Sequence, residues 1–231
     1  MTDDRRNKYI RRKALDLAGI GRSVELMPPS PPHRSRAKLF GSPVFEAFTL
    51  VSLRAFVVVW TILLPAILVI AVQYAPTVWA PLLIVAGALG WTLAEYGLHR
   101  YVFHFKARSA TLQRLIFIIH GNHHEVPNDP LRNLMPPVVS VPVGLLVWGL
   151  CIGLMGPLGT WCFLGFMLGY VGYDLVHYAC HQLPMKGRLS RLLKVHHMRH
   201  HHLQADGNYA ITGMVWDRLL STRVAAGRGK S

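Results

Sequence analysis

The chain has 231 residues, of which 52% are hydrophobic and only 16% are charged. A soluble domain usually carries about 25% charged residues, so this composition disfavours a soluble class and favours a membrane protein. The formal net charge of +14 would suit either nucleic acid or anionic lipid as a partner. The positions of the charges along the chain decide between these two partners.

The chain begins with a polar, basic segment, residues 1–42, that contains the proline-rich run MPPSPPHRSR. Because prolines disfavour a helix, we expect this tail to be disordered or to lie on a membrane surface. It lacks the apolar core of a cleavable signal peptide, so the first apolar stretch is expected to direct insertion. Residues 223–231 are expected to form a flexible C-terminal tail.

Four apolar stretches follow the tail, and each approaches the roughly 20 residues that a helix needs to cross a bilayer. The joints within the first pair and within the second pair are short. The pattern therefore predicts an all-α integral membrane domain over residues 43–222, with four transmembrane helices arranged as two hairpins. The four stretches are residues 55–72, 77–94, 138–156 and 158–173.

The charged residues indicate the orientation of these helices. All 25 Lys and Arg lie in residues 1–54, 95–137 and 182–231, and neither hairpin tip carries a charged residue. By the positive-inside rule, both termini and the segment between the hairpins are cytoplasmic. Topology and attraction to anionic headgroups then explain the basic excess, and no nucleic-acid partner is expected.

The chain contains 13 histidines, and all except His33 fall into four clusters on the predicted cytoplasmic side. Neutral imidazole is the commonest protein metal ligand, so the clusters predict a cytoplasmic helical cap that holds a metal site. One ion takes four to six ligands, so the ten histidines named at the end of this paragraph indicate two ions. His196 and His202 point off the shared helical face and are not expected to bind. The predicted ligands are His99, His104, His120, His123, His124, His177, His181, His197, His200 and His201.

Helical spacing supports shared binding for three of the clusters. His177 and His181 are four residues apart and leave one face of a helix, and the runs HGNHH and HHMRHHH each place three histidines on one face. His99 and His104 are five residues apart, about 140° around a regular helix. That pair requires a helix break, a π-bulge or binding from opposite sides of the site.

Two carboxylates lie close to predicted ligands in the sequence. Glu95 precedes His99 by one helical turn, and Asp174 precedes His177 by three residues. Either carboxylate is suited to hold the free N–H of a ligating imidazole and so to fix its tautomer. The alternative for Asp174 is an ordinary charge at a helix end.

Four segments together resemble the motifs of the fatty acid hydroxylase (sterol desaturase) superfamily, nearest to its fatty acid 2-hydroxylase branch. The resemblance covers about residues 45–222. Asn133-Leu134 is slightly out of register, and Ala210 stands where the family usually has glycine. The segments are EYGLHRYVFH (95–104), HGNHHEVPNDPLRNLMPP (120–137), GYDLVHYACH (172–181) and KVHHMRHHHLQADGNYAITGMVWDRLLST (194–222).

The resemblance implies a membrane di-iron enzyme that hydroxylates a lipid acyl chain, at carbon 2 of a fatty acyl group, with O₂ and two electrons. Zinc does no redox chemistry, so two iron ions are expected and zinc only as a non-catalytic occupant. The short tail has no room for the cytochrome b5 domain of many family members. A separate electron donor, cytochrome b5-like or ferredoxin-type, is therefore expected, and a bacterial inner membrane is preferred over the endoplasmic reticulum.

Other motif positions are expected to serve the substrate or the fold. Asp129, Arg132 and Asp217 are predicted to position a lipid headgroup or to tie cytoplasmic segments together, with the structural role favoured. Nearby aromatic residues either line the entry of the acyl chain or belong to an interfacial belt. They are Tyr101, Phe103, Tyr178, Tyr209 and Trp216.

Two alternative functions stay open at this point. A desaturase, or a hydroxylase of a sterol, carotenoid or aminolipid, would use a similar histidine cluster. From a different class, the protein would be a membrane metal transporter or sensor. A transporter should carry polar ligands near mid-span, and the centres of the predicted spans are almost free of ionisable residues.

Overall fold

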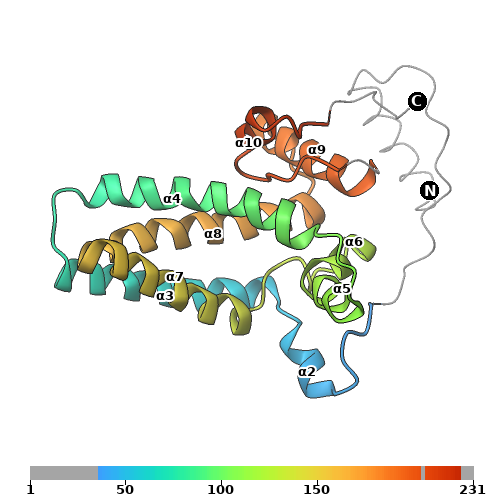
Figure 1. The fold of residues 1–231 in the computed structure, drawn as a ribbon, viewed down its shortest axis with the longest axis horizontal. Helices are drawn as coiled ribbons and strands as arrows, with labels where there is room; N and C mark the ends of the chain where they lie inside the picture. Colours follow the sequence, from blue (N-terminus) through green and yellow to red (C-terminus); the bar gives the residue numbers. More distant parts are fainter. Residues whose placement is uncertain (1–35, 204–205, 225–231) are drawn as a thin grey trace. The chain divides into compact units, whose positions relative to one another are not determined.

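The computed structural model describes residues 36–203 and 206–224, and in these ranges it contains helices, turns and loops but no strand. Four long helices run alongside one another (Figure 1), and they cover the four apolar stretches predicted above. Helix α8 packs against each of the other three. The four are α3 (Leu53–Tyr74), α4 (Ala80–Gly97), α7 (Pro137–Met155) and α8 (Gly159–Gln182).

Three segments are long and apolar enough to cross a membrane: Leu53–Tyr74, Ala80–Phe103 and Pro137–Gln182. The last has 46 residues and contains both α7 and α8, which the short 3₁₀ turn η3 (Gly156–Leu158) separates. Gly156 has φ of +59°, which glycine adopts without strain, and there the chain turns back so that α8 packs on α7. The chain is therefore a membrane protein by its helices, and the crossing of the membrane by four of them stays a prediction.

The outward faces of these helices are apolar. Ile62 on α3 is 63% exposed and Leu146 on α7 is 76% exposed. Apolar side chains on the outside of a helical bundle suit contact with lipid rather than with water. The inner faces form an aromatic core, in which Trp60 and Trp91 each meet Tyr170 edge-on with ring centroids 5.4 and 5.2 Å apart.

Helices α4 and α8 approach so closely that their backbones touch. A Cβ atom on Gly87 would lie 1.9 Å from the carbonyl oxygen of Cys162, and one on Gly165 would lie 2.0 Å from that of Ile84. Small residues allow membrane helices to pack at this distance. Because α4 ends just before His99, this packing brings the ends of α4 and α8 together.

Shorter helices gather at the end where α4 and α8 finish (Figure 1). Two of the segments there are π-helical, η1 (Leu98–Phe103) directly after α4 and η2 (Phe117–Gly121). This helical end carries all four histidine clusters, and its cytoplasmic location stays a prediction. The other helices are α2 (Pro43–Phe48), α5 (Ala110–Ile116), α6 (Asn122–Glu125), α9 (Arg188–His202) and α10 (Val215–Leu219).

The described part of the predicted N-terminal tail is bound to the domain. The guanidinium group of Arg36 donates to both carboxylate oxygens of Asp129, at 2.6 and 2.9 Å. The backbone N–H groups of Leu39 and Phe40 donate to Glu46 of α2. The ordered domain thus begins before residue 43, whereas residues 1–35, with His33, and residues 225–231 lie outside the described residues.

Candidate metal centre

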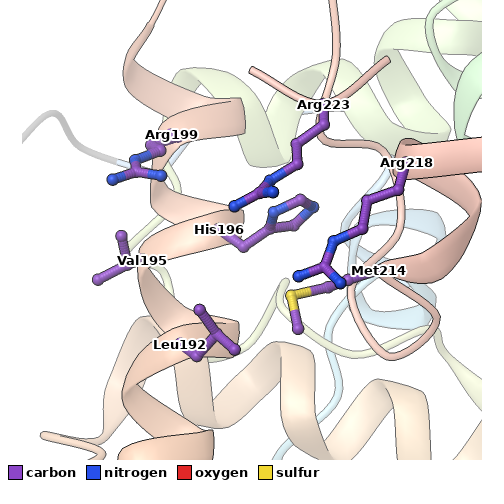
Figure 2. A pocket seen from close by; sticks show the side chains of 7 residues that line it. All are labelled: Leu192, Val195, His196, Arg199, Met214, Arg218 and Arg223. Carbon is purple, nitrogen blue, oxygen red and sulfur yellow. The ribbon is translucent and has the colours of Figure 1, made fainter. Parts of the chain in front are cut away.

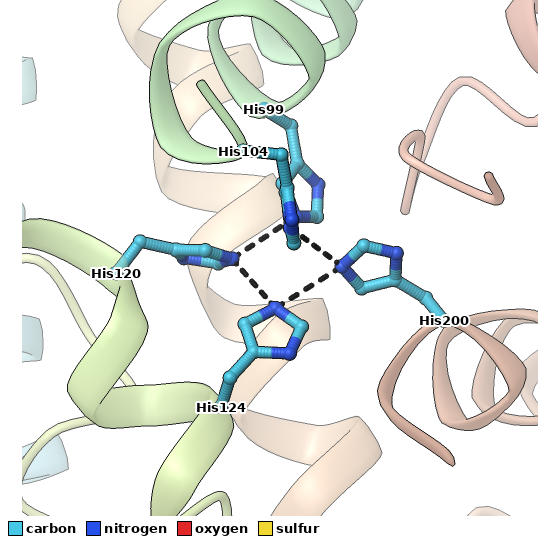
Figure 3. A group of neighbouring side chains, drawn as sticks. All are labelled: His99, His104, His120, His124 and His200. Atoms are coloured by element: carbon cyan, nitrogen blue, oxygen red, sulfur yellow. Dashed lines mark hydrogen bonds between the residues drawn. The ribbon is translucent and has the colours of Figure 1, made fainter. Parts of the chain in front are cut away.

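The structure brings the ten predicted histidines together in two groups of five. In each group one ring nitrogen per histidine lies within 4.8 Å of all the others. Figure 3 shows group 1, in which five rings from four segments point toward one centre. His196 and His202 belong to neither group. Group 1 is His99, His104, His120, His124 and His200, and group 2 is His123, His177, His181, His197 and His201.

The π-helical segment η1 explains how His99 and His104 reach the same group. The backbone N–H of His104 donates to the carbonyl of His99 at 3.2 Å, which is the five-residue hydrogen bond of a π-turn. This wider turn places residues five apart on one side of the helix, and the two ring centroids are 5.0 Å apart. Of the three alternatives that the spacing left open, the structure shows the π-helical one.

A second π-turn, η2, ends at the HGNHH run. The side-chain amide of Asn122 donates to the carbonyls of Phe117 and Ile118 at 3.0 and 2.7 Å, which ties this side chain to the turn that precedes it. Asn122 is buried and was missed by sequence reasoning. A polar residue in the middle of a histidine run was the available signal.

The two HxxHH runs do not each present three histidines to one site, so that interpretation is wrong. His120 and His124 join group 1 while His123 joins group 2, and on α9 His197 and His201 join group 2 while His200 joins group 1. Residues four apart differ by about 40° around a helix, but neighbours differ by about 100°. Each run therefore lies between the two groups and contributes histidines to both.

The Nε2 atoms of group 1 approach one another closely (Figure 3). The His120–His99 and His120–His124 distances are 3.1 and 2.9 Å, and those of His200 to His104 and His124 are 3.0 and 3.1 Å. At a metal–nitrogen distance of about 2.1 Å, two nitrogens at right angles about an ion are about 3.0 Å apart. The spacing of the ring nitrogens therefore fits a shared cation.

Hydrogen bonds between the rings do not account for this arrangement. His99 Nδ1 donates to the carbonyl of Tyr209 and His200 Nδ1 to that of Gly207, because a carbonyl only accepts. In these two neutral rings Nε2 then carries a lone pair and no hydrogen. Only the Nε2 atoms of His104, His120 and His124 remain to supply hydrogens for the four close Nε2–Nε2 contacts. At least one of these contacts therefore has no hydrogen between its two nitrogens. A bound cation would accept every lone pair.

Group 2 has the same spacing and fewer protein partners. His177 Nε2 lies 2.9 Å from His123 Nε2, and His181 Nε2 lies 2.8 Å from His197 Nε2. His177 Nδ1 donates to the carbonyl of Asn133, but within the described residues the buried Nδ1 atoms of the other four rings have no hydrogen-bond partner. A cation at the Nε2 atoms would supply the polar interaction that orients these rings.

The imidazoles outside the membrane-spanning segments are held in the neutral form that binds metal. Burial, together with neighbouring imidazoles, lowers the pKa of His124 to about 3. Burial lowers the pKa of His200 to about 4, although its hydrogen bond to Gly207 opposes this. The pKa values of His120, His123 and His197 lie well below 6.5 for the same reasons of burial and adjacent rings. The lone pairs of these ring nitrogens can therefore bind a metal ion at neutral pH without the prior loss of a proton.

Glu95 and Asp174 are buried beside the groups, but each binds backbone. Glu95 accepts from the backbone N–H groups of Ile211 and Thr212 and from the Thr212 hydroxyl. Asp174 accepts from the backbone N–H of Met135 at 3.1 Å. Both carboxylates hold segments that carry the carbonyl partners of ligating rings, so the structure shows support of the loops rather than a direct bond to an imidazole.

Asp217 organises the loop that follows α9. Its carboxylate is fully buried and accepts from the backbone N–H groups of Tyr209 and Ala210, from the Thr222 hydroxyl and from His196 Nε2 at 3.0 Å. Burial raises the pKa of this carboxyl, but the hydrogen bonds, with His196 first, outweigh burial and lower it. This explains why His196 is buried without belonging to either group.

Replacing Asp217 with asparagine is expected to destabilise the protein by about 2 kcal/mol or more, because a buried backbone donor is left without an acceptor. The loop also carries Tyr209, whose carbonyl holds His99, so metal bound at group 1 should fall more than metal at group 2. Thermal melting and metal analysis of the purified protein measure both effects. The exposed Asp206, which pairs with Lys106, gives the control D206N; equal melting temperatures for the two variants would contradict this role.

Asp129 and Arg132 tie together segments at the helical end that carries the histidines. Asp129 binds Arg36 and the backbone N–H of Leu131, and Arg132 binds Glu46 at 2.5 Å. Burial raises the pKa of Asp129, but its bonds to Arg36 and Leu131 lower it below the ordinary value. These contacts join the N-terminal segment, α2 and the loop after α6.

The aromatic residues near the site differ in their placement. Phe103 stacks on His120 with ring centroids 5.0 Å apart, and Tyr209 is buried with its ring 5.5 to 5.8 Å from three rings of group 1. Tyr101 is 60% exposed, Tyr178 is half-buried, and Trp216 donates to the Thr92 hydroxyl. Of these five aromatic residues, Phe103 and Tyr209 are the two with ring contacts to the histidines among the described residues.

A model of the fatty acid hydroxylase family matches residues 84–222, which include all ten histidines. The chain belongs to the fatty acid hydroxylase family. A solved structure of full-length scs7p, in which only the hydroxylase domain is visible, superposes with a TM-score of 0.75 and 30% identity over 83% of this chain and 74% of that chain. The fold described above is therefore the family's fold.

Relatives in this family carry names that describe lipid hydroxylation. A dihydroceramide fatty acyl 2-hydroxylase of Arabidopsis thaliana is 37% identical over 142 residues, 61% of this chain and 60% of the relative. The fatty acid 2-hydroxylase of Homo sapiens is 39% identical over 148 residues, 62% and 39%. A ceramide very long chain fatty acid hydroxylase of Saccharomyces cerevisiae is 31% identical over 195 residues, 82% and 50%. The chain thus spans between about two fifths and three fifths of these relatives.

Proposed function

We propose that this protein is a membrane di-iron oxygenase that hydroxylates the acyl chain of a lipid, at carbon 2 of a fatty acyl group. The observation that carries the proposal is the pair of five-imidazole groups in a family whose relatives are named fatty acid 2-hydroxylases. The ten histidines hold the metal and are not acids or bases in the reaction. Their shared placement at one end of the helices lets a lipid reach them from the bilayer.

Iron is the metal that the chemistry requires. Hydroxylation of an unactivated C–H bond needs a redox-active ion, and imidazole suits iron, whereas zinc in the same sites would be inactive. Bound iron would supply the activation of O₂ with two electrons from a separate donor, cytochrome b5-like or ferredoxin-type. The chain's own contribution is to fix five imidazoles around each position and to keep them neutral.

The proposal includes a topology. Helices α3, α4, α7 and α8 each cross the membrane, both termini and the two histidine groups are cytoplasmic, and the substrate headgroup stays at the interface. The distribution of Lys and Arg supports this orientation. A bacterial inner membrane remains the preferred location.

An apolar groove between α3 and α8 suits an acyl chain. It encloses about 310 Å³, and its lining includes Phe56, Trp60, Leu64 and Pro65 of α3 and Leu175 of α8. Residues 56 to 65 cover about 14 Å of helix at 1.5 Å per residue. The groove starts beside the segment of α8 that carries His177 and runs toward the middle of the bundle. An acyl chain whose headgroup lies at the interface would follow the same path.

Replacing Leu64 with tryptophan is expected to fill this groove and to lower hydroxylation of long acyl chains about tenfold or more. The reason is that a displacement of the bound substrate by about 1 Å already lowers the reaction rate strongly. Activity on a series of acyl chain lengths measures the effect. The control is Ile62→Trp, since Ile62 lies outside the groove lining and is already exposed. Equal losses from L64W and I62W at every chain length would exclude the groove as the acyl site.

Lipid analysis tests the proposed activity. A host without 2-hydroxylated lipids is made to express the wild type or a variant in which His197, His200 and His201 are all alanine. We expect 2-hydroxyacyl chains only with the wild type. New double bonds, or hydroxylated sterols or carotenoids with unchanged acyl chains, would instead support the desaturase or other hydroxylase alternatives.

A further inference from the structure

A small basic pocket lies on the cap outside both histidine groups (Figure 2). Arg199 of α9, Arg218 of α10 and Arg223 line it together with the buried His196. The guanidinium groups of Arg218 and Arg223 lie beside His196, whereas the Arg199 side chain extends away from them at the edge of the pocket. Leu192 and Met214 complete its apolar wall. The pocket is therefore positively charged with apolar sides.

Within the described part of the chain, the three arginines of the pocket take part in no ion pair with a carboxylate. The carboxylate nearest in sequence to Arg218 and Arg223, Asp217, is fully buried and already bound by His196 and by backbone donors. The one nearest in sequence to Arg199, Asp206, pairs with Lys106. Guanidinium groups form their strongest hydrogen bonds with phosphate and carboxylate, so the pocket is suited to an anion.

Helix α10, which lines this pocket, is fixed against one of the candidate membrane spans. Trp216 of α10 donates from Nε1 to the hydroxyl of Thr92 at 3.1 Å, and Thr92 belongs to the candidate span Ala80–Phe103. The pocket is therefore held close to a helix that is suited to contact with lipid.

The surface beside the pocket is apolar. Leu189 and Leu192 on α9 are 67% and 47% exposed, and Val215 and Leu219 on α10 are 53% and 67% exposed. Exposed leucine and valine next to unpaired arginine is the pattern of a helix pair that lies in the membrane interface. A soluble acidic protein would pair with the arginines but would leave these apolar side chains without a role.

We propose that the pocket of Arg199, Arg218 and Arg223 binds the phosphate of an anionic phospholipid, while Leu189, Leu192, Val215 and Leu219 contact its acyl region. This lipid is distinct from the acyl chain that is hydroxylated. The hydrogen-bond path from His196 through Asp217 to Tyr209, whose carbonyl holds His99, connects the pocket to group 1. Bound lipid would therefore fix the height and orientation of the cap on the membrane.

Native mass spectrometry of the full chain in detergent, titrated with phosphatidylglycerol, tests this site. Each basic residue near a membrane surface contributes a factor of about five, so the triple variant R199Q/R218Q/R223Q should bind about a hundredfold more weakly. The control R54Q/R108Q/R114Q removes the same charge from three exposed arginines outside the pocket and should bind as the wild type does. Phosphatidylcholine should bind all three proteins alike, and inorganic phosphate alone should bind weakly.

Several outcomes would overturn the proposal. Equal losses in the pocket variant and the control would show a general effect of charge. Binding of inorganic phosphate as tight as that of phosphatidylglycerol would show a free-anion site. A polyglutamate peptide that binds the wild type but not the pocket variant, while phosphatidylglycerol binds both, would show a protein-docking surface. If the triple variant melts early, the single variant R223Q serves instead, and because turnover is not measured, these results are independent of the proposed enzymatic function.

Discussion

The double variant H197A/H201A is expected to lose the metal of group 2 and to retain that of group 1, so that two ions per chain become one. These two side chains supply two of the five Nε2 atoms of group 2, 3.1 Å apart on one face of α9. Loss of residues that merely support metal ligands already costs 10- to 100-fold, so activity should fall by at least about a hundredfold. Elemental analysis of the purified protein, with acyl hydroxylation measured in parallel, tests this result.

Two further variants make that measurement specific. His202 lies on the same helix but in neither group, so H202A should keep both ions and its activity. The variant H120A/H124A should remove the ion of group 1 in the same way and leave that of group 2. Loss of both ions in each double variant would show a single coupled centre, and unchanged metal content would contradict the assignment of these histidines.

Replacing Gly165 with leucine is expected to separate α4 from α8 and to lower stability by about 3 kcal/mol or more, the upper range for overpacked cores. A Cβ there would lie 2.0 Å from the backbone oxygen of Ile84, and a backbone atom does not rotate away as a side chain does. For a chain of this size the melting temperature should fall by about 6–12 °C. Melting in detergent and metal content measure the loss, since His99 comes directly after α4 and His177 lies in the last part of α8.

Gly153 provides the matched control for this prediction. It lies on α7, and a Cβ there meets nothing within 4 Å, so G153L should melt close to the wild type. If G165L and G153L melt at the same temperature, the close contact of α4 and α8 does not govern stability.

The sequence was sufficient to predict the long helices and the set of ten histidines. Uninterrupted apolar stretches without charge leave a helix in lipid as the favoured structure, and the observed helices α3, α4, α7 and α8 cover them. The spacing of His99 and His104 was sufficient to single out this pair, because a regular helix would point the two side chains apart, but it left open whether the helix is irregular or the site is bound from opposite sides. Both inferences rest on local geometry.

The sequence was not sufficient to predict how the histidines divide between the two groups. His123 could belong either to the group of His120 or to the group of His177. Its group depends on which helix ends lie on the two sides of the HGNHH run, and the packing of α4 on α8 decides their position. The partners of Glu95 and Asp217 were unpredictable for a similar reason, because both bind backbone N–H groups of the 207–212 loop, which has no regular pattern. The contact of Arg36 with Asp129 spans 93 residues, and local composition had suggested only a tail.

Incorporation of oxygen from ¹⁸O₂ tests the central claim most directly. The iron-loaded protein is placed in lipid with a reductant and an electron donor, under ¹⁸O₂ in ordinary water, and the acyl chains are examined by mass spectrometry. The account predicts one ¹⁸O atom on carbon 2 of the acyl chain, lost in H197A/H201A. A hydroxyl group that carries oxygen from water, or a product oxidised elsewhere in the lipid, would contradict it.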